Sequence, residues 1–309
     1  LNNLAMLYQR LGKYDAAERL YQRILATDHN AREKNSPEIS PTLNNLAALY
    51  VIQGRYAKAE SLYQRALKIE EKTVGVDHPQ VATVLNNIAG LYDEQGKYDA
   101  AEPLYERALA IREETLGTEH PDVARVLSNQ ALLYKRLGRY ESAEQFYRRS
   151  LSIRESVLGR DHPELAMTLH NLAGLYYAQD RYGEAEPLYR RSLAIWEQAL
   201  GLDHPSVAMT LHNLAILKVA THQPQAAVPL MQRSLQIDDQ TIERVFSLAS
   251  ERDKFAFLRT VSYRFDQLQS LVIQEFSTDP EAVRTALDAT LRRKGQVLEA
   301  LSRERRALL

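Results

Sequence analysis

A repeat with a fixed period of 42 residues constrains this chain of 309 residues more than any other feature. The segment Leu-Asn-Asn-Leu-Ala begins at Leu1 and returns, unchanged or in variants, at Leu43, Leu85, Leu127, Leu169 and Leu211. Fifteen of the 17 tyrosines occupy three positions of the repeat, which indicates that they pack between units. Such a period is typical of a solenoid, in which each unit buries its apolar face against its neighbours. We therefore predict six units over residues 1–237, beginning at about 1, 43, 85, 127, 169 and 211.

Each unit is predicted to be a pair of helices. In the second unit, Leu43, Leu46, Ala47 and Tyr50 follow the i, i+3, i+4, i+7 spacing of an amphipathic helix, and a second stripe of this kind follows. Gly54 lies between the two stripes, where the chain must reverse, because glycine tolerates a positive φ. The expected fold class is all-α: a right-handed superhelical α-solenoid of helix-turn-helix hairpins, with extra C-terminal capping helices.

The junctions between units carry helix stop and start signals. A glycine ends each second helix as a C-cap, and a His-Pro pair then opens the next unit, where proline suits the first helical turn. The glycines are Gly75, Gly117, Gly159 and Gly201, and the histidines are His78, His120, His162 and His204. We expect these histidines to act as caps rather than as metal ligands, because a solenoid spreads equivalent residues along its axis.

Composition excludes several classes of protein. A hydrophobic content of 45%, with 26% charged residues and no long apolar run, argues against a membrane protein. The net charge of −1 argues against a nucleic-acid partner, and the lack of cysteine removes thiolate chemistry and suits the cytoplasm. We find no phosphate-binding glycine loop and no serine elbow, so we expect neither an enzyme nor a cofactor. Leu1 already lies inside a repeat, so we expect the chain to be a fragment.

The repeated pattern resembles a known family. Leu-x-x-Leu-Ala-x-x-Tyr, then Gly-x-Tyr-x-x-Ala, then Tyr-x-x-Ala/Ser-Leu is similar to the tetratricopeptide repeat (TPR). The 42-residue form, with Ala-Ile-Arg-Glu-x-x-Leu-Gly-x-x-His-Pro at 110–121, resembles the kinesin light chain subfamily. The match is weakest in the sixth unit, where Lys218, Pro224 and Met231 replace the three tyrosines. The resemblance implies a protein or peptide partner, but not motor function, because no sustained heptad array is present.

Residues 238–309 leave the period and are predicted to form a helical cap or connector. Two or three helices are expected here, with capping signals near Ser250 and Thr278 that open one helix running to Phe276 and one through 286–301. The stretch 286–301 is similar to the connector that precedes a caspase-like CHAT domain in bacterial proteins. That resemblance implies a bacterial source and a protease domain downstream.

Asparagine at one position of every first helix is the main candidate for function. Asparagine inside a helix costs roughly half a kcal/mol relative to alanine, so its recurrence suggests a role. The resemblance places this position on the concave groove, where an amide can both donate to and accept from the main chain of an extended peptide. The alternative is an asparagine ladder that holds neighbouring hairpins in register, and the two roles can coexist. The residues are Asn3, Asn45, Asn87, Asn129, Asn171 and Asn213.

Residues beside this row are expected to tune specificity. Asn44, Asn86 and His170 precede three of the asparagines by one position. Arg125, Lys135 and Arg136 form a basic cluster that could hold an acidic side chain or a C-terminal carboxylate. The alternative is a solvated helix face whose charges are balanced by nearby acidic residues.

Three kinds of function remain open from sequence. The first is a module that binds an extended peptide or protein segment. The second is the sensor arm of a larger protein with the CHAT protease domain, and the third is a purely structural scaffold.

Overall fold

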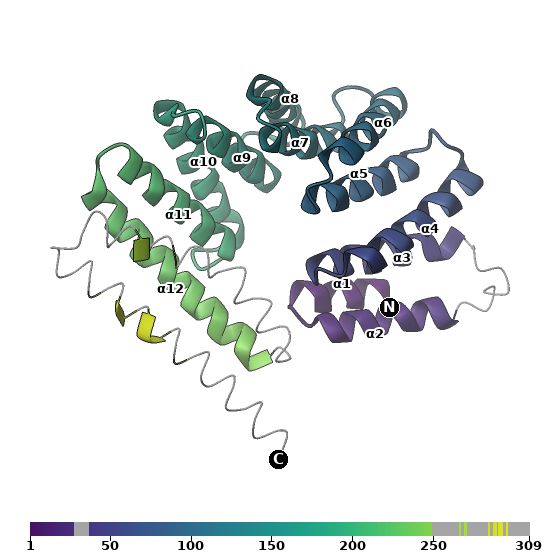
Figure 1. Ribbon diagram of the computed structural model, residues 1–309, viewed down its shortest axis with the longest axis horizontal. Coiled ribbons are helices and arrows are strands. Elements are labelled where there is room, and N and C mark those ends of the chain that lie inside the picture. Colours follow the sequence, from purple (N-terminus) through teal and green to yellow (C-terminus); the bar gives the residue numbers. More distant parts are fainter. Residues whose placement is uncertain are drawn as a thin grey trace, which may run out of the picture. The chain divides into compact units, whose positions relative to one another are not determined.

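The computed structural model describes residues 1–27 and 37–248, with isolated positions 266, 269–270, 284, 287–288, 290–292 and 295. The described ranges contain helices and no strand, which confirms the predicted all-α fold of helical hairpins (Figure 1). They divide into two compact units, Leu1–Leu175 and Tyr176–Leu309. None of the described helices combines the length and apolar character needed to cross a membrane.

The helices follow the predicted alternation of first and second helices. The first unit holds α1 (Asn2–Arg10), α2 (Tyr14–Thr27), η2 (Pro37–Ile39), α3 (Ser40–Ile52), α4 (Tyr56–Val74), α5 (Pro79–Glu94), α6 (Tyr98–Leu116), α7 (Pro121–Arg136), α8 (Tyr140–Leu158) and most of α9 (Pro163–Tyr177). The second unit holds α10 (Tyr182–Leu200), α11 (Pro205–Ala220) and α12 (Pro224–Leu248). The predicted end of the repeats at residue 237 falls within α12, which continues to Leu248. The connector helices expected near 250–276 and 286–301 lie outside the described residues, apart from the isolated positions.

Local signals set the ends of these helices as predicted. Gly54 and Gly96 turn the chain between paired helices with φ of 71°. Asp180 and His222, which replace glycine at this position, adopt the same left-handed conformation with φ of 57° and 56°. Glycine also supplies the C-cap of the longer second helices, as at Gly75.

The four histidines cap the helices that follow them. The Nδ1 atom of His78 accepts a hydrogen bond from the backbone N–H of Gln80, at 3.2 Å, and His120 does the same to Asp122 at 3.1 Å. His162 and His204 repeat this contact. The acceptor atom satisfies one of the N–H groups that every helix leaves unpaired at its start.

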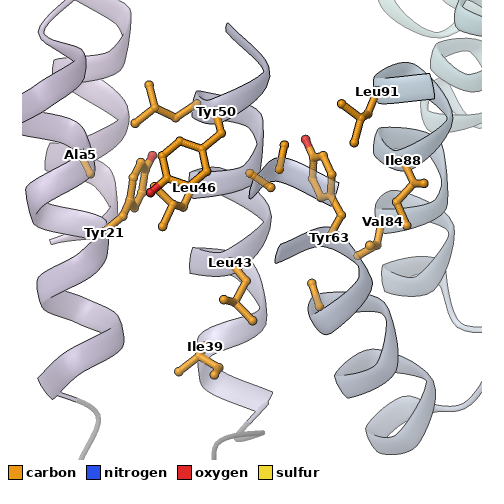
Figure 2. Close-up of a cluster of buried hydrophobic side chains, with 14 of the residues drawn as sticks. Ala5, Tyr21, Ile39, Leu43, Leu46, Tyr50, Tyr63, Val84, Ile88 and Leu91 are labelled. Carbon is orange, nitrogen blue, oxygen red and sulfur yellow. The ribbon is translucent and has the colours of Figure 1, made fainter. Parts of the chain in front are cut away.

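Buried tyrosines and leucines fill the space between successive hairpins. Tyr21 and Tyr63 are buried at the same position of two second helices. Figure 2 shows Tyr21 beside Leu46, and Tyr63 near Val84 of α5. Small alanines lie between the helices of each pair, so the backbones approach closely and one core continues through several hairpins.

Neighbouring hairpins are also joined by a polar clasp, in which a side chain of one first helix contacts a glutamate of the preceding second helix. The Tyr50 hydroxyl donates to Glu18 Oε1 at 2.9 Å, and Arg55 stacks over the Tyr50 ring while pairing with Glu18 at 2.7 Å. The clasp recurs one unit later, where the Tyr92 hydroxyl donates to Glu60 at 2.8 Å.

The sixth repeat keeps this clasp with a different residue. Lys218 stands at the tyrosine position and its ammonium lies 2.7 Å from Glu186, on the preceding second helix. An ion pair has replaced the hydroxyl contact, so the weak sequence match at this position preserves the same connection.

The first helices of the first unit lie closer together than the second helices. Each first helix contacts the first helix of the next hairpin, from α1 through α3 and α5 to α7. Within the described ranges, consecutive second helices approach one another less. In this unit the first helices of successive hairpins therefore lie next to one another along the stack.

Candidate functional site

The asparagine row lies on the first helices and is partly accessible. Asn3 is exposed, while Asn45, Asn87, Asn129 and Asn171 are intermediate in exposure. In the first unit, one amide of this row is therefore presented by each of α1, α3, α5, α7 and α9.

Two of these amides are bonded to the preceding hairpin. Asn87 Nδ2 donates to Asn44 Oδ1 at 2.9 Å, and Asn129 Nδ2 donates to Asn86 Oδ1 at 3.0 Å. Asn86 Nδ2 also donates to Asn87 Oδ1 at 3.3 Å, which links the two pairs into one chain. From α3 to α7 the asparagines thus form the ladder that the sequence offered as the alternative role.

The amides of this row differ in how much of their hydrogen-bonding capacity is used. Within the described part of the chain, the side chains of Asn45 and Asn171 make no hydrogen bond with another protein group. Asn129 uses one N–H in the ladder and leaves its Oδ1 oxygen unused. In the second unit, Asn213 hydrogen-bonds the buried Tyr189. The ladder and a peptide-reading role are therefore compatible, because they use different atoms of the row.

The residues one position earlier lie deeper. Asn86 is 5% exposed and His170 is 6% exposed, whereas Asn44 is intermediate. Burial lowers the pKa of His170 to about 4, with a smaller contribution from the charge of Lys135, so this imidazole is neutral at neutral pH. Asn86 and His170 are thus buried residues, less accessible than the asparagines that follow them.

Two members of the basic cluster are neutralised by acidic neighbours. Arg125 pairs with Asp122 at 2.9 Å on its own helix. Arg136 pairs with Asp93 and Glu94 of α5, both at 3.1 Å. Burial raises the pKa of Asp93, and Arg136 opposes that rise. For these two arginines the structure matches the balanced helix face that the sequence offered as the alternative.

Lys135 differs from the two arginines beside it. Its side chain is half-buried, and it forms no ion pair or hydrogen bond within the described part of the chain. Burial lowers the pKa of its ammonium group, and the adjacent charge of Arg136 lowers it further.

Sequence reasoning missed two buried arginines that reach between the first helices. Arg112 donates to Thr83 of α5 at 2.5 Å and also pairs with Asp122 of α7. Arg154 donates to Ser128 of α7 at 2.9 Å and to Thr168 of α9. The only signal was the recurrence of Ile-Arg-Glu in both second helices.

In the ranges that the structure describes, histidines and acidic residues do not gather in groups of three that could hold an ion.

Comparisons with known proteins agree with this architecture. A profile of the tetratricopeptide repeat family matches residues 1–72, 38–114, 80–156, 122–195 and 164–240. The solved structure of BtubC (BKLC) from P. vanneervenii is similar, with 26% identity, a TM-score of 0.59, and coverage of 76% of this chain and 92% of that one. A Podosopora anserina protein with nearly identical TPR-like repeats of the kinesin light chain type is 28% identical, with a TM-score of 0.55 and coverage of 67% and 98%. A form of that protein with one substitution is also 28% identical, with a TM-score of 0.55 and coverage of 66% of this chain and 97% of that one. No curated protein matches. Two of these solved structures carry repeats of the kinesin light chain type. The chain therefore belongs to the tetratricopeptide repeat family.

Proposed function

We propose that this chain is a protein-interaction module that binds an extended segment of a partner along its first helices. The tetratricopeptide repeat fold is a general scaffold for protein interaction, which supports the class of function. The observation that carries the proposal is the row of partly accessible amides, one on each first helix of the first unit.

The chemistry of this row suits a main chain rather than a particular side chain. An extended peptide presents alternating N–H and C=O groups, and an amide side chain can pair with either. Asn45 and Asn171 can make such contacts with no loss of an internal bond, and Asn129 retains its Oδ1 as an acceptor.

The two roles of the row can be separated by choosing which asparagine to replace. Asn45→Ala and Asn171→Ala remove amides that hold no other hairpin, so we expect weaker peptide binding at unchanged stability. Asn87→Ala and Asn129→Ala break ladder bonds of 2.9 and 3.0 Å, so we expect them to lower stability as well. Each lost bond should cost about 1 kcal/mol.

The experiment is a selection from a phage-displayed library of short random peptides against the whole chain. The best peptide is then measured by fluorescence anisotropy against the four variants, and their stabilities are measured by urea unfolding. Gln64→Ala is the matched control, because it removes an exposed amide from the second helix α4. Binding that survives both Asn45→Ala and Asn171→Ala would refute the proposed contact, and a library that yields no binder would favour the scaffold.

A further inference from the structure

We propose that the seam between α7 and α9 is a subsite for an acidic side chain of the bound segment, with the Lys135 ammonium as its counter-ion. This inference rests on the proposed function and adds the chemical class of the partner: an extended segment with an internal aspartate or glutamate.

Lys135 is placed at this seam by helix periodicity. Ser128 and Lys135 are seven residues apart, so they share one face of α7, two turns from each other. The Ser128 Oγ lies 3.3 Å from Thr168 Oγ1, and Thr168 belongs to α9. The face that carries Lys135 is therefore the one turned toward α9.

The preceding seam shows how the same positions look when their charges are balanced. Asp93 of α5 stands at the repeat position of Lys135, and it is buried and paired with Arg136 of the next hairpin. One repeat later, the position of Arg136 is occupied by Ala178, which carries no charge. The α5/α7 seam thus contains both charges of a pair, whereas the α7/α9 seam contributes only the cation.

The surroundings of Lys135 offer no substitute anion. Arg136 is a second cation, and the buried His170 of α9 is neutral at neutral pH. An ammonium that has lost part of its hydration without gaining a partner is unfavourable, and a ligand carboxylate would relieve that cost. Arg125 and Arg136 are less suited to bind a ligand carboxylate, because each already forms an ion pair. Arg125 pairs with Asp122, and Arg136 pairs with Asp93 and Glu94.

The amides beside the seam indicate an internal acidic residue rather than a chain end. Asn129 lies on α7 and Asn171 lies on α9, so main-chain contacts are available on both sides of the seam. A segment held at both amides continues past Lys135 in each direction, and a side-chain carboxylate is then the group that reaches the ammonium.

The test compares peptides selected from the random library by the wild-type chain. We expect aspartate or glutamate to be enriched at one aligned position, and replacement of that residue by its amide to weaken binding about tenfold, as for a partly desolvated ion pair. In Lys135→Met the acidic peptide and its amide form should bind equally. Lys68→Met is the matched control, because it removes an exposed lysine from α4, and it should keep the tenfold preference.

The possible failures of the two proposals are distinguishable. Peptides that bind through Asn45 and Asn171 but show no acidic preference would overturn the subsite and leave the interaction module intact. An acidic preference that persists unchanged in Lys135→Met would also overturn the subsite, since the carboxylate would then lie elsewhere. A selection that yields no binder would overturn both. Thermal melting checks that Lys135→Met is folded, and Lys135→Gln provides a second neutral variant.

Discussion

Protonation of one buried histidine should make the fold sensitive to acid. His170 lies on α9 and is 6% exposed, and its pKa falls from 6.5 to about 4, first because of burial and then because of the Lys135 charge. Above pH 6.5 the imidazole is neutral in both the folded and the unfolded chain, so its contribution to stability is constant. As the pH falls from 6.5 toward 4, the unfolded chain takes up a proton that the folded chain does not. At about 1.4 kcal/mol for each pH unit, the folded state loses about 3 kcal/mol over this window.

Urea unfolding of His170→Asn, followed by far-ultraviolet circular dichroism at several pH values, measures this loss. Asparagine occupies the same repeat position at Asn44 and Asn86, so the variant is compatible with the fold. The difference in unfolding free energy between wild type and variant cancels the titration of all other groups. We expect that difference to fall by about 3 kcal/mol between pH 6.5 and 4. Parallel curves for the two proteins would refute the reasoning, and the exposed His222→Asn is the matched control.

Three further perturbations test the packing between and within hairpins. Tyr92→Phe removes the 2.8 Å hydrogen bond to Glu60 and should lower the unfolding free energy by about 1 kcal/mol in urea titrations. Gly96→Ala should lower the unfolding free energy by about 1 kcal/mol, because Gly96 has a φ of 71° that strains an alanine backbone. The added Cβ meets no atom within 4 Å, so the strain is the only expected cause. Gly183→Ala, within α10, should instead stabilise the fold by about 0.5 kcal/mol, and equal effects at the two glycines would contradict the strain argument. Lys135→Met should raise the melting temperature, because it removes a partly desolvated charge that has no ion pair, and a lower melting temperature would indicate a hidden partner.

The hairpins were predictable because their signals are local. Gly54 terminates one helix through its own φ, and His78 caps the next through a backbone group two residues away. The buried face of each helix follows from spacings of three and four residues. Such interactions need no knowledge of how one hairpin is rotated against the next, so a single repeat is enough to infer them.

The candidate site was less predictable because its decisive contacts join residues about one repeat apart. Lys135 and Arg136 are adjacent and both basic, yet only Arg136 reaches the carboxylates of α5, across 42 and 43 residues. Asn86 and Asn87 are likewise adjacent and identical, yet Asn86 is buried and Asn87 is partly exposed. These differences depend on the rotation between hairpins, which periodicity within a helix does not determine.

The same dependence explains why identical asparagines of one row differ in their availability to a ligand. Asn87 and Asn129 are bonded because an asparagine stands at the facing position of the preceding hairpin. For Asn171 the facing position is Ser128, whose hydroxyl is engaged by Arg154 and Ser150, so this amide stays available. For Asn45 the facing residue is Asn2, which bonds Thr42 instead. The residue one hairpin earlier thus decides whether each of these asparagines bonds across the hairpins or keeps its amide free. If the row binds a peptide as proposed, we expect a change at Ser128 or Asn2 to alter that binding without touching the row itself.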